Sequence, residues 1–297
     1  MAPLFWPFSH IRGRRRATPF VALHGPLCSA RATAYFQDIR AHYRLIGFTS
    51  HTDFPRAYKD RLDLDWLSAC EGWCHCFRDP SQFLPKGPPF ILISYSDFVD
   101  CRPRFPIRVP KKYDVGFVCS AGTWKEHTKN WHFAVSCFSQ LLAAPPLRIV
   151  VIGHEYAADV PGPVTALPEL EHQHLLEVLS TCRCALFTAI MDASPRLIPE
   201  CLCLDVPIVV YSKILGGWKY VNRHTGRFFD DEFSVRSAVN DCILHCDRSS
   251  AWYFANYGPQ LSGARLARFL RQIEPSLTER YVYLEPWQNP PAARGGE

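Results

Sequence analysis

Short apolar runs rich in β-branched and aromatic residues alternate along this chain with longer amphipathic stretches. The alternation is most regular after residue 110. Because such runs predict buried parallel strands and the amphipathic stretches predict helices that cover them, we expect an α/β fold built on doubly wound sheets. In this second part the predicted strands are 114–119, 148–152, 184–188 and 207–211, and the predicted helices are 131–142, 170–180, 234–246 and 262–273.

The first hundred residues show a weaker form of the same pattern. A proline-rich run at 102–110 then interrupts all periodicity, which is typical of a linker between domains. In this first part the predicted strands are 20–23, 45–49 and 90–94, and the predicted helices are 30–42 and 64–77. We therefore predict a disordered basic leader over 1–18, a small first domain over 19–106, a second domain over 107–274 and a tail over 275–297.

The composition is that of a globular protein, with 47% hydrophobic and 21% charged residues among 297. The net charge of +5 is spread along the chain, and the only basic cluster, at 14–16, is too small to predict a nucleic-acid partner. The 13 cysteines include many inside apolar runs, where a reduced thiol behaves as a small hydrophobe. No run approaches the ~18 apolar residues of a membrane span, and we expect a soluble, cytoplasmic protein.

The amino-terminal segment leaves a second location open. Residues 1–37 contain no acidic residue and several arginines, a balance found in organellar targeting segments. The alternative is a basic leader without structure. A secretory signal is not predicted, because the first residues lack a continuous apolar core.

The most informative stretch, residues 191–200, lies between the predicted strand 184–188 and a predicted helix. Ser194 and Pro195 suit the cap and the first position of that helix, so free amides at its start would face an anion such as a diphosphate. Asp192 and Glu200 flank these amides, and both carboxylates could reach one ligand. The alternative is an ordinary capped helix start, with Glu200 as a surface acid or an acid satisfied by other protein groups.

Four motifs follow one another from this stretch onward. They are Asp192-x7-Glu200, the strand with its lead-in at 202–210, Leu215-Gly216-Gly217, and the run 225–229. In this order they resemble the donor-binding domain of the family 4 glycosyltransferases of the GT-B fold, over roughly residues 114–271. The resemblance implies two Rossmann-like domains, of which the first is small or reduced here.

The resemblance also implies roles for the acids and the glycines. Glu200 would bind the ribose of a nucleoside-diphosphate sugar, and Asp192 the hydroxyls of the transferred sugar. Asp192 stands where the family has a glutamate, so its reach is one methylene shorter. Gly216 and Gly217 would let the backbone approach the sugar or the diphosphate, with an ordinary turn as the alternative.

Positive charge for the diphosphate would come from the segment before the predicted helix 131–142. Lys129 matches the lysine of the family's basic pair by position, and Lys125 could replace the missing arginine. A solvated surface lysine is the alternative for Lys129. The backbone around Ser194, Pro195 and Arg196 would complete this diphosphate site.

The expected activity is thus a metal-independent, retaining sugar transfer to a carbohydrate or glycoconjugate acceptor. The nucleotide sugar would be the donor substrate, and no cofactor would be needed. Two departures from the family remain: Pro199 lies near the helix start, and the acid expected after the glycine pair is absent from Trp218-Lys219-Tyr220. Trp218 could stack on a base or sugar, although a core position is the commoner one.

Other functions compete with this interpretation. A catalytically silent sugar-nucleotide or carbohydrate-binding module is one, and a nucleotide-binding oxidoreductase is disfavoured because no Gly-x-Gly-x-x-Gly follows a strand. A zinc site at Cys70, Cys74, His75 and Cys76 lacks paired Cys-x2-Cys knuckles. Asp63 and Asp65 match the metal-binding Asp-x-Asp motif of the other large glycosyltransferase fold, and we interpret this match as a chance occurrence. Polar candidates for facing a cleft from the first domain are His24, Asp38, His51 and the segment 71–76.

Overall fold

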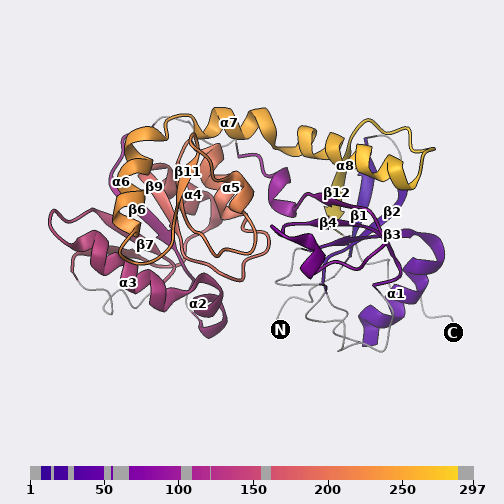
Figure 1. The fold of residues 1–297 in the computed structure, drawn as a ribbon, viewed down its shortest axis with the longest axis horizontal. Coiled ribbons are helices and arrows are strands. Elements are labelled where there is room, and N and C mark those ends of the chain that lie inside the picture. Colours follow the sequence, from indigo (N-terminus) through magenta and orange to yellow (C-terminus); the bar gives the residue numbers. More distant parts are fainter. Residues whose placement is uncertain are drawn as a thin grey trace. The chain divides into compact units, whose positions relative to one another are not determined.

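The computed structural model describes residues 8–14, 17–25, 30–49, 55, 67–101, 109–120, 122–154 and 162–286. The chain divides into two compact units, the first formed by residues 1–94 and 259–297 and the second by residues 95–258. Figure 1 labels the helices and strands of both units. Among the described residues, no helix combines the length and the apolar character that crossing a bilayer requires.

The first unit is built on a mixed six-stranded sheet with the order β12-β1-β2-β3-β4-β5. Strands β2 to β5 run parallel, and β1 pairs antiparallel with both β2 and β12. The elements are β1 (Phe8–Gly13), β2 (Ala17–Leu23), α1 (Ala30–His42), β3 (Arg44–Phe48), β4 (Cys70–His75), the 3-10 helix η2 (Pro80–Gln82), β5 (Phe90–Leu92), α8 (Pro259–Ile273) and β12 (Val282–Pro286).

Strands β1 and β12 lie where the sequence predicts a disordered leader and a tail. Phe8 and Ile11 of β1 are buried, while Arg12 of the same strand pairs with Glu285 of β12. The basic residues in and after β1 are typical of a disordered leader. The sequence does not show that Arg12 is neutralised, because its partner Glu285 lies more than 270 residues away along the chain. Helix α8, predicted within the second domain, also belongs to the first unit.

The predicted helix over 64–77 is wrong, because residues 70–75 form strand β4, which lies between β3 and β5 in the sheet. Most of β4 is buried, including Trp73 and Cys74, so the polar–apolar alternation of a half-exposed strand is missing. Neighbouring β3 makes room for the large ring at Gly47, where a Cβ would lie 2.1 Å from the Trp73 side chain.

The second unit carries a parallel sheet with the order β11-β10-β9-β6-β7-β8. Read from β8, this is the 3-2-1-4-5-6 order of the Rossmann fold. The elements are η3 (Tyr95–Phe98), β6 (Tyr113–Val118), α2 (Thr123–Lys129), α3 (Trp131–Leu142), β7 (Ile149–Ile152), β8 (Val164–Leu167), α4 (His172–Ser180), β9 (Cys182–Phe187), α5 (Leu197–Cys203), β10 (Ile208–Tyr211), η6 (Trp218–Tyr220), β11 (Gly226–Phe229), α6 (Val235–His245) and α7 (Ser249–Asn256).

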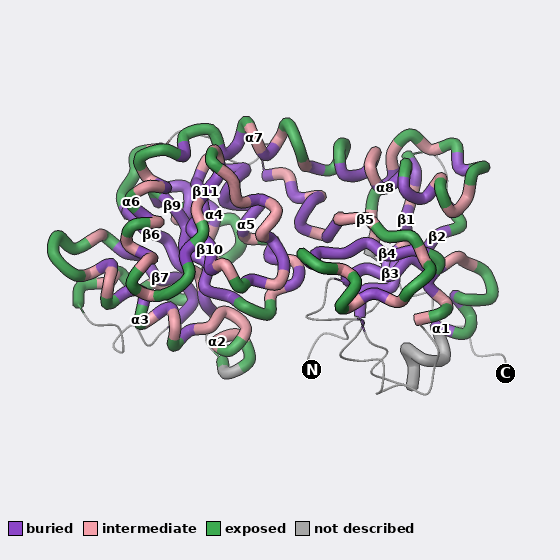
Figure 2. The backbone as a smooth tube through the Cα atoms, viewed as in Figure 1, coloured by how far each residue is buried: buried purple, intermediate pink, exposed green. Residues whose placement is uncertain are grey.

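Each face of this sheet has its own core. Successive residues of a strand point to opposite faces, so Ile149 and Val151 of β7 pack in the core with α3 and α6, whereas Val150 and Ile152 pack with α4 and α5. Figure 2 shows most strands of this sheet buried and most exposed positions on helices and loops, whereas the edge strand β8 is partly exposed. Helices on both faces therefore bury the sheet, which explains its nearly continuous apolar strands.

The chain enters the second unit earlier than the proline-rich run suggests. Ser96 and Asp97 of η3 are buried, and the Tyr253 hydroxyl of α7 donates to the carbonyls of Ser96 (3.3 Å) and Val99 (3.0 Å). The units divide at residues 94/95 and 258/259, whereas the sequence predicts boundaries at 106/107 and 274/275. A proline-rich run can interrupt helices and strands within a domain as well as between domains, so it does not by itself locate a domain boundary.

Candidate functional site

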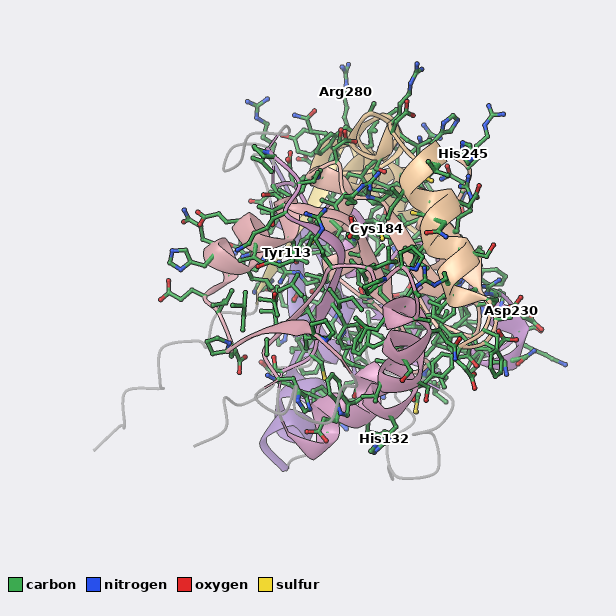
Figure 3. The ribbon with its side chains drawn as sticks, turned by 90° about the vertical axis from the view of Figure 1, so that its left-hand side faces the viewer. Tyr113, His132, Cys184, Asp230, His245 and Arg280 are labelled. Atoms are coloured by element: carbon green, nitrogen blue, oxygen red, sulfur yellow. The ribbon has the colours of Figure 1, made fainter. Side chains whose placement is uncertain are left out.

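The strand order of the second unit creates a switch point between β6 and β9. From β6 the chain moves outward through β7 and β8, then crosses to the other side of β6 to form β9, β10 and β11. In open α/β sheets ligands bind at the carboxyl ends of the strands at such a point. Tyr113 and Cys184 mark these two strands in Figure 3. The segments that follow them carry Lys129 and Asp192.

Lys129 and Asp192 form an ion pair at this switch point. Their Nζ and Oδ2 atoms are 2.7 Å apart, and the side chains are 30% and 17% exposed. Asn130 ends α2 with a left-handed φ of 57°, which asparagine tolerates. The Thr188 hydroxyl donates to the Lys129 carbonyl (2.6 Å), and Asn130 Nδ2 donates to the Thr188 carbonyl (3.3 Å). The end of α2 is thus tied to the end of β9, which holds the two charges together.

The glycine pair packs against the loop that carries Asp192. The Gly216 amide donates to the Asp192 carbonyl at 2.9 Å. A Cβ on Gly216 would lie 1.9 Å from the Ala193 carbonyl oxygen, so a larger residue would push the loops apart. Gly217 has a φ of 81°, and a Cβ there would lie 2.6 Å from the Pro195 ring. These loop contacts account for both glycines, and their contact with a ligand stays a prediction.

The predicted helix start at Ser194 and Pro195 is wrong. Helix α5 begins at Leu197, with Arg196 in the cap position and no side-chain cap. The Ser194 hydroxyl instead lies 2.7 Å from the Ser96 hydroxyl and accepts a bond from the Ser96 amide at 3.2 Å. Because this tertiary partner occupies the Ser194 side chain, no capped helix start supports the diphosphate role predicted for Ser194, Pro195 and Arg196, which remains a prediction.

Glu200 is a buried carboxylate inside α5, with only 4% of the residue exposed. Its Oε1 lies 3.0 Å from Nε2 of His172 and 3.8 Å from Nη2 of Arg196. Pro199 fits the third helical position because the first amides of a helix have no acceptor within it. No local spacing in the sequence pointed to His172, which belongs to a different helix.

Lys125 lies on the same helix as Lys129 but pairs with a different acid. Its Nζ is 3.4 Å from Oε1 of Glu169, and the two side chains are 45% and 66% exposed. The Ser120 hydroxyl donates to the same oxygen at 3.2 Å. Glu169 follows β8, so this pair also lies among the segments at the carboxyl ends of the strands. The role of Lys125 as a second positive charge stays a prediction.

A buried ion pair that the sequence did not reveal follows the glycine pair. Lys219 Nζ and Asp97 Oδ2 are 2.7 Å apart, with side chains 5% and 0% exposed. The Tyr220 hydroxyl donates to the other oxygen of Asp97. Burial and the neighbouring Asp97 raise the pKa of Tyr220 well above its ordinary value, so the phenol is neutral. Trp218 is partly buried against the core.

Two thiols close to the site are protonated at neutral pH. Burial raises the pKa of Cys119, at the end of β6, to about 11, and Glu126 acts in the same direction. Burial, with a smaller contribution from Glu200, raises the pKa of Cys201 well above its ordinary value. Neither residue is a thiolate nucleophile in this state.

Two of the polar candidates of the first unit are described within that unit. His24 is buried, and burial lowers its pKa to about 3, while Asp38 is exposed and its Oδ1 lies 3.6 Å from His42 Nδ1. His51, Asp63 and Asp65 lie outside the described residues. In the described part of the chain, no three His, Cys, Asp or Glu side chains gather to hold a metal ion. The alternative zinc ligands Cys70, Cys74, His75 and Cys76 lie on and beside β4, where the alternation of a strand points His75 to the face opposite Cys74.

Comparison with known proteins adds information on the fold. No family model matches the sequence, and no curated protein matches it. Sucrose-phosphate synthase from Thermosynechococcus elongatus has a similar structure, with a TM-score of 0.54 at 9% identity over 82% of this chain and 71% of the synthase. The pneumococcal O-GlcNAc transferase GtfA, solved with UDP and GlcNAc, has a TM-score of 0.52 at 11% identity over 83% of this chain and 55% of GtfA.

A third similar structure is HepE of Anabaena in complex with UDP-glucose, with a TM-score of 0.53 at 12% identity over 82% of this chain and 76% of HepE. This chain therefore spans little more than half the length of GtfA but about three quarters of HepE. At such identities the likeness concerns the fold, and assignment to family 4 stays a prediction. The predicted fold class is confirmed, and the chain has the Rossmann-like α/β fold of the GT-B glycosyltransferases.

Proposed function

We propose that this protein is a glycosyltransferase that transfers a sugar from a nucleoside-diphosphate sugar to a carbohydrate or glycoconjugate acceptor. The observation that carries the proposal is the Lys129–Asp192 ion pair at the switch point between β6 and β9. Sheets with this strand order bind nucleotides at that point. Neighbours in fold that were solved with UDP and GlcNAc or with UDP-glucose support the donor class.

In the proposed reaction the anomeric carbon loses its bond to the diphosphate and forms one to an acceptor oxygen, whose proton is released. Negative charge grows on the departing diphosphate, and the Lys129 ammonium stabilises it, with Lys125 as a second positive charge. Asp192 and Glu200 accept hydrogen bonds from sugar and ribose hydroxyls, respectively. Because lysine supplies the positive charge, the proposed step uses no metal ion. Retention of the anomeric configuration rests on the resemblance to family 4 alone.

The proposal is tested first by binding. Thermal unfolding is followed with UDP-, GDP- and ADP-sugars, and one donor class should raise the melting temperature as its concentration rises, by about 2.7 kcal/mol of stability at 100 times the dissociation constant. Glu200→Gln should weaken this effect, whereas Glu177→Gln, an exposed acid on α4, should leave it intact. Absence of any donor effect in the unaltered protein would contradict the proposal.

Turnover then distinguishes an enzyme from a silent module. Release of nucleoside diphosphate is measured with the donor that binds, in the unaltered protein and in Lys129→Met. We expect release that falls by about 100-fold or more in the variant, because the leaving group loses its positive partner. If the donor binds tightly but no nucleoside diphosphate is released with any acceptor tested, a catalytically silent binding module is favoured instead.

A further inference from the structure

The buried carboxylate of Glu200 is held by an imidazole from another helix. His172 is the first residue of α4, and its Nε2 lies 3.0 Å from Oε1 of Glu200. Glu200 has a side chain that is 6% exposed, whereas the His172 side chain is 47% exposed. The imidazole therefore joins a buried acid to the protein surface.

The contacts of this carboxylate are one-sided. Within the described ranges, the ion pairs and hydrogen bonds recorded for Glu200 all end on Oε1, from His172 and more distantly from Arg196. An ionised carboxylate has about four lone-pair sites on its two oxygens. The arrangement fixes one oxygen and leaves Oε2 to accept hydrogen bonds from a ligand.

We infer that His172 is a positioning residue that orients Glu200 toward the hydroxyl groups of a bound nucleoside. The inference rests on the proposed function and adds a residue to its donor site. When the proton lies on Nε2, the imidazole donates a hydrogen bond to Oε1 of Glu200. The glutamate side chain is then restrained before the nucleoside arrives, so less conformational freedom is lost on binding.

A structural role for His172 alone predicts something different. If the histidine only joins α4 to α5, its loss weakens every nucleotide equally, because the effect does not depend on the hydroxyls of the sugar ring. If it positions Glu200, its loss matters only for nucleosides that carry these hydroxyls. The ratio between the two kinds of ligand therefore separates the roles.

The experiment compares UDP, GDP and ADP with their 2′,3′-dideoxy analogues by isothermal titration calorimetry. In the unaltered protein, the diphosphate that binds should bind more tightly than its dideoxy analogue. In His172→Ala the ratio of the two dissociation constants should fall by about tenfold, the usual effect of one hydrogen bond to a charged group. His172→Gln, whose amide can also donate, should restore part of the ratio.

The matched control is His174→Ala, since His174 is exposed on the same helix. It should leave the ratio unchanged. An unchanged ratio in His172→Ala, with melting temperature and dideoxy binding retained, overturns the inference while the proposed function stands. If the unaltered protein binds none of the diphosphates, the proposed function fails and the inference fails with it.

Discussion

The Lys129–Asp192 ion pair leads us to expect that the loss of one of its residues, Asp192, strengthens the binding of a free nucleoside diphosphate. Replacing Asp192 by asparagine removes a negative charge whose oxygen lies 2.7 Å from Lys129 Nζ. A diphosphate that contacts this ammonium must share it with the carboxylate. We therefore expect Asp192→Asn to bind a free nucleoside diphosphate more tightly than the unaltered protein does.

The size of the effect follows from the geometry. A phosphate oxygen in contact with the ammonium would lie about 5 Å from the carboxylate, where two unit charges repel by about 3 kcal/mol at an effective dielectric constant of about 20. The two side chains are 30% and 17% exposed, so water screens part of this repulsion. Half of the value, about 1.5 kcal/mol, corresponds to about tenfold tighter binding.

Isothermal titration calorimetry with the diphosphate of the stabilising donor measures the change, at low and at high salt. The gain should shrink as salt rises, because screening already weakens the repulsion. Glu177→Gln is the control, since it removes an exposed acid that accepts a hydrogen bond from Gln173 on α4, and it should change affinity by less than about threefold. Equal or weaker binding by Asp192→Asn at every salt concentration would refute the electrostatic reasoning.

Three further predictions concern the frame of the site and the stability of the fold. Gly216→Ala should weaken diphosphate binding by about tenfold in the same titration, because the new Cβ would lie 1.9 Å from the Ala193 carbonyl oxygen and displace the loop. Asp97→Ala should lower the free energy of unfolding in urea by about 3–5 kcal/mol, because Lys219 would stay buried without its anion. Below pH 6.5 His24 takes up a proton in the unfolded chain, whereas burial lowers its pKa to about 3 in the folded chain and keeps it unprotonated. The free energy of unfolding should therefore fall by up to about 1.4 kcal/mol for each unit by which the pH is lowered.

The controls for these changes are independent of the site. Asp247→Ala removes an exposed acid and should leave the urea midpoint nearly unchanged. Phenylalanine at position 24 cannot titrate, so the loss of stability between pH 6.5 and 5 should be smaller in His24→Phe than in the unaltered protein. Equal losses in both proteins would show that His24 does not cause the acid sensitivity.

Local patterns located most of the second unit, and they failed where tertiary contacts decide. Strand β10 and helix α3 were predicted because their apolar spacing is complete within the segment. Strand β4 was predicted as a helix, since burial on both faces erased its alternation. Strand β1 was missed because it pairs with β12 from the far end of the chain.

The same distinction applies to the site. The sequence predicts Lys129 and Asp192 as site residues, because Lys129 lies just before a recognisable helix and Asp192 lies after a recognisable strand, and the structure brings them together. The partner of Ser194 was not foreseen, because Ser96 lies in a segment that resembled part of a first domain. His172 was missed for the same reason: its contact with Glu200 depends on how two helices pack.

The acid that is absent after the glycine pair has a structural explanation. The Lys219 side chain is only 5% exposed and faces the fully buried Asp97, which also accepts a hydrogen bond from the Tyr220 hydroxyl. A glutamate at 219 would place two carboxylates side by side in a buried space, where the ionisation of one disfavours that of the other. A lysine neutralises Asp97 instead and fixes the segment that follows Gly217. The departure at this position therefore follows from the burial of Asp97 and does not count against the donor site that we propose for Lys129, Asp192 and Glu200.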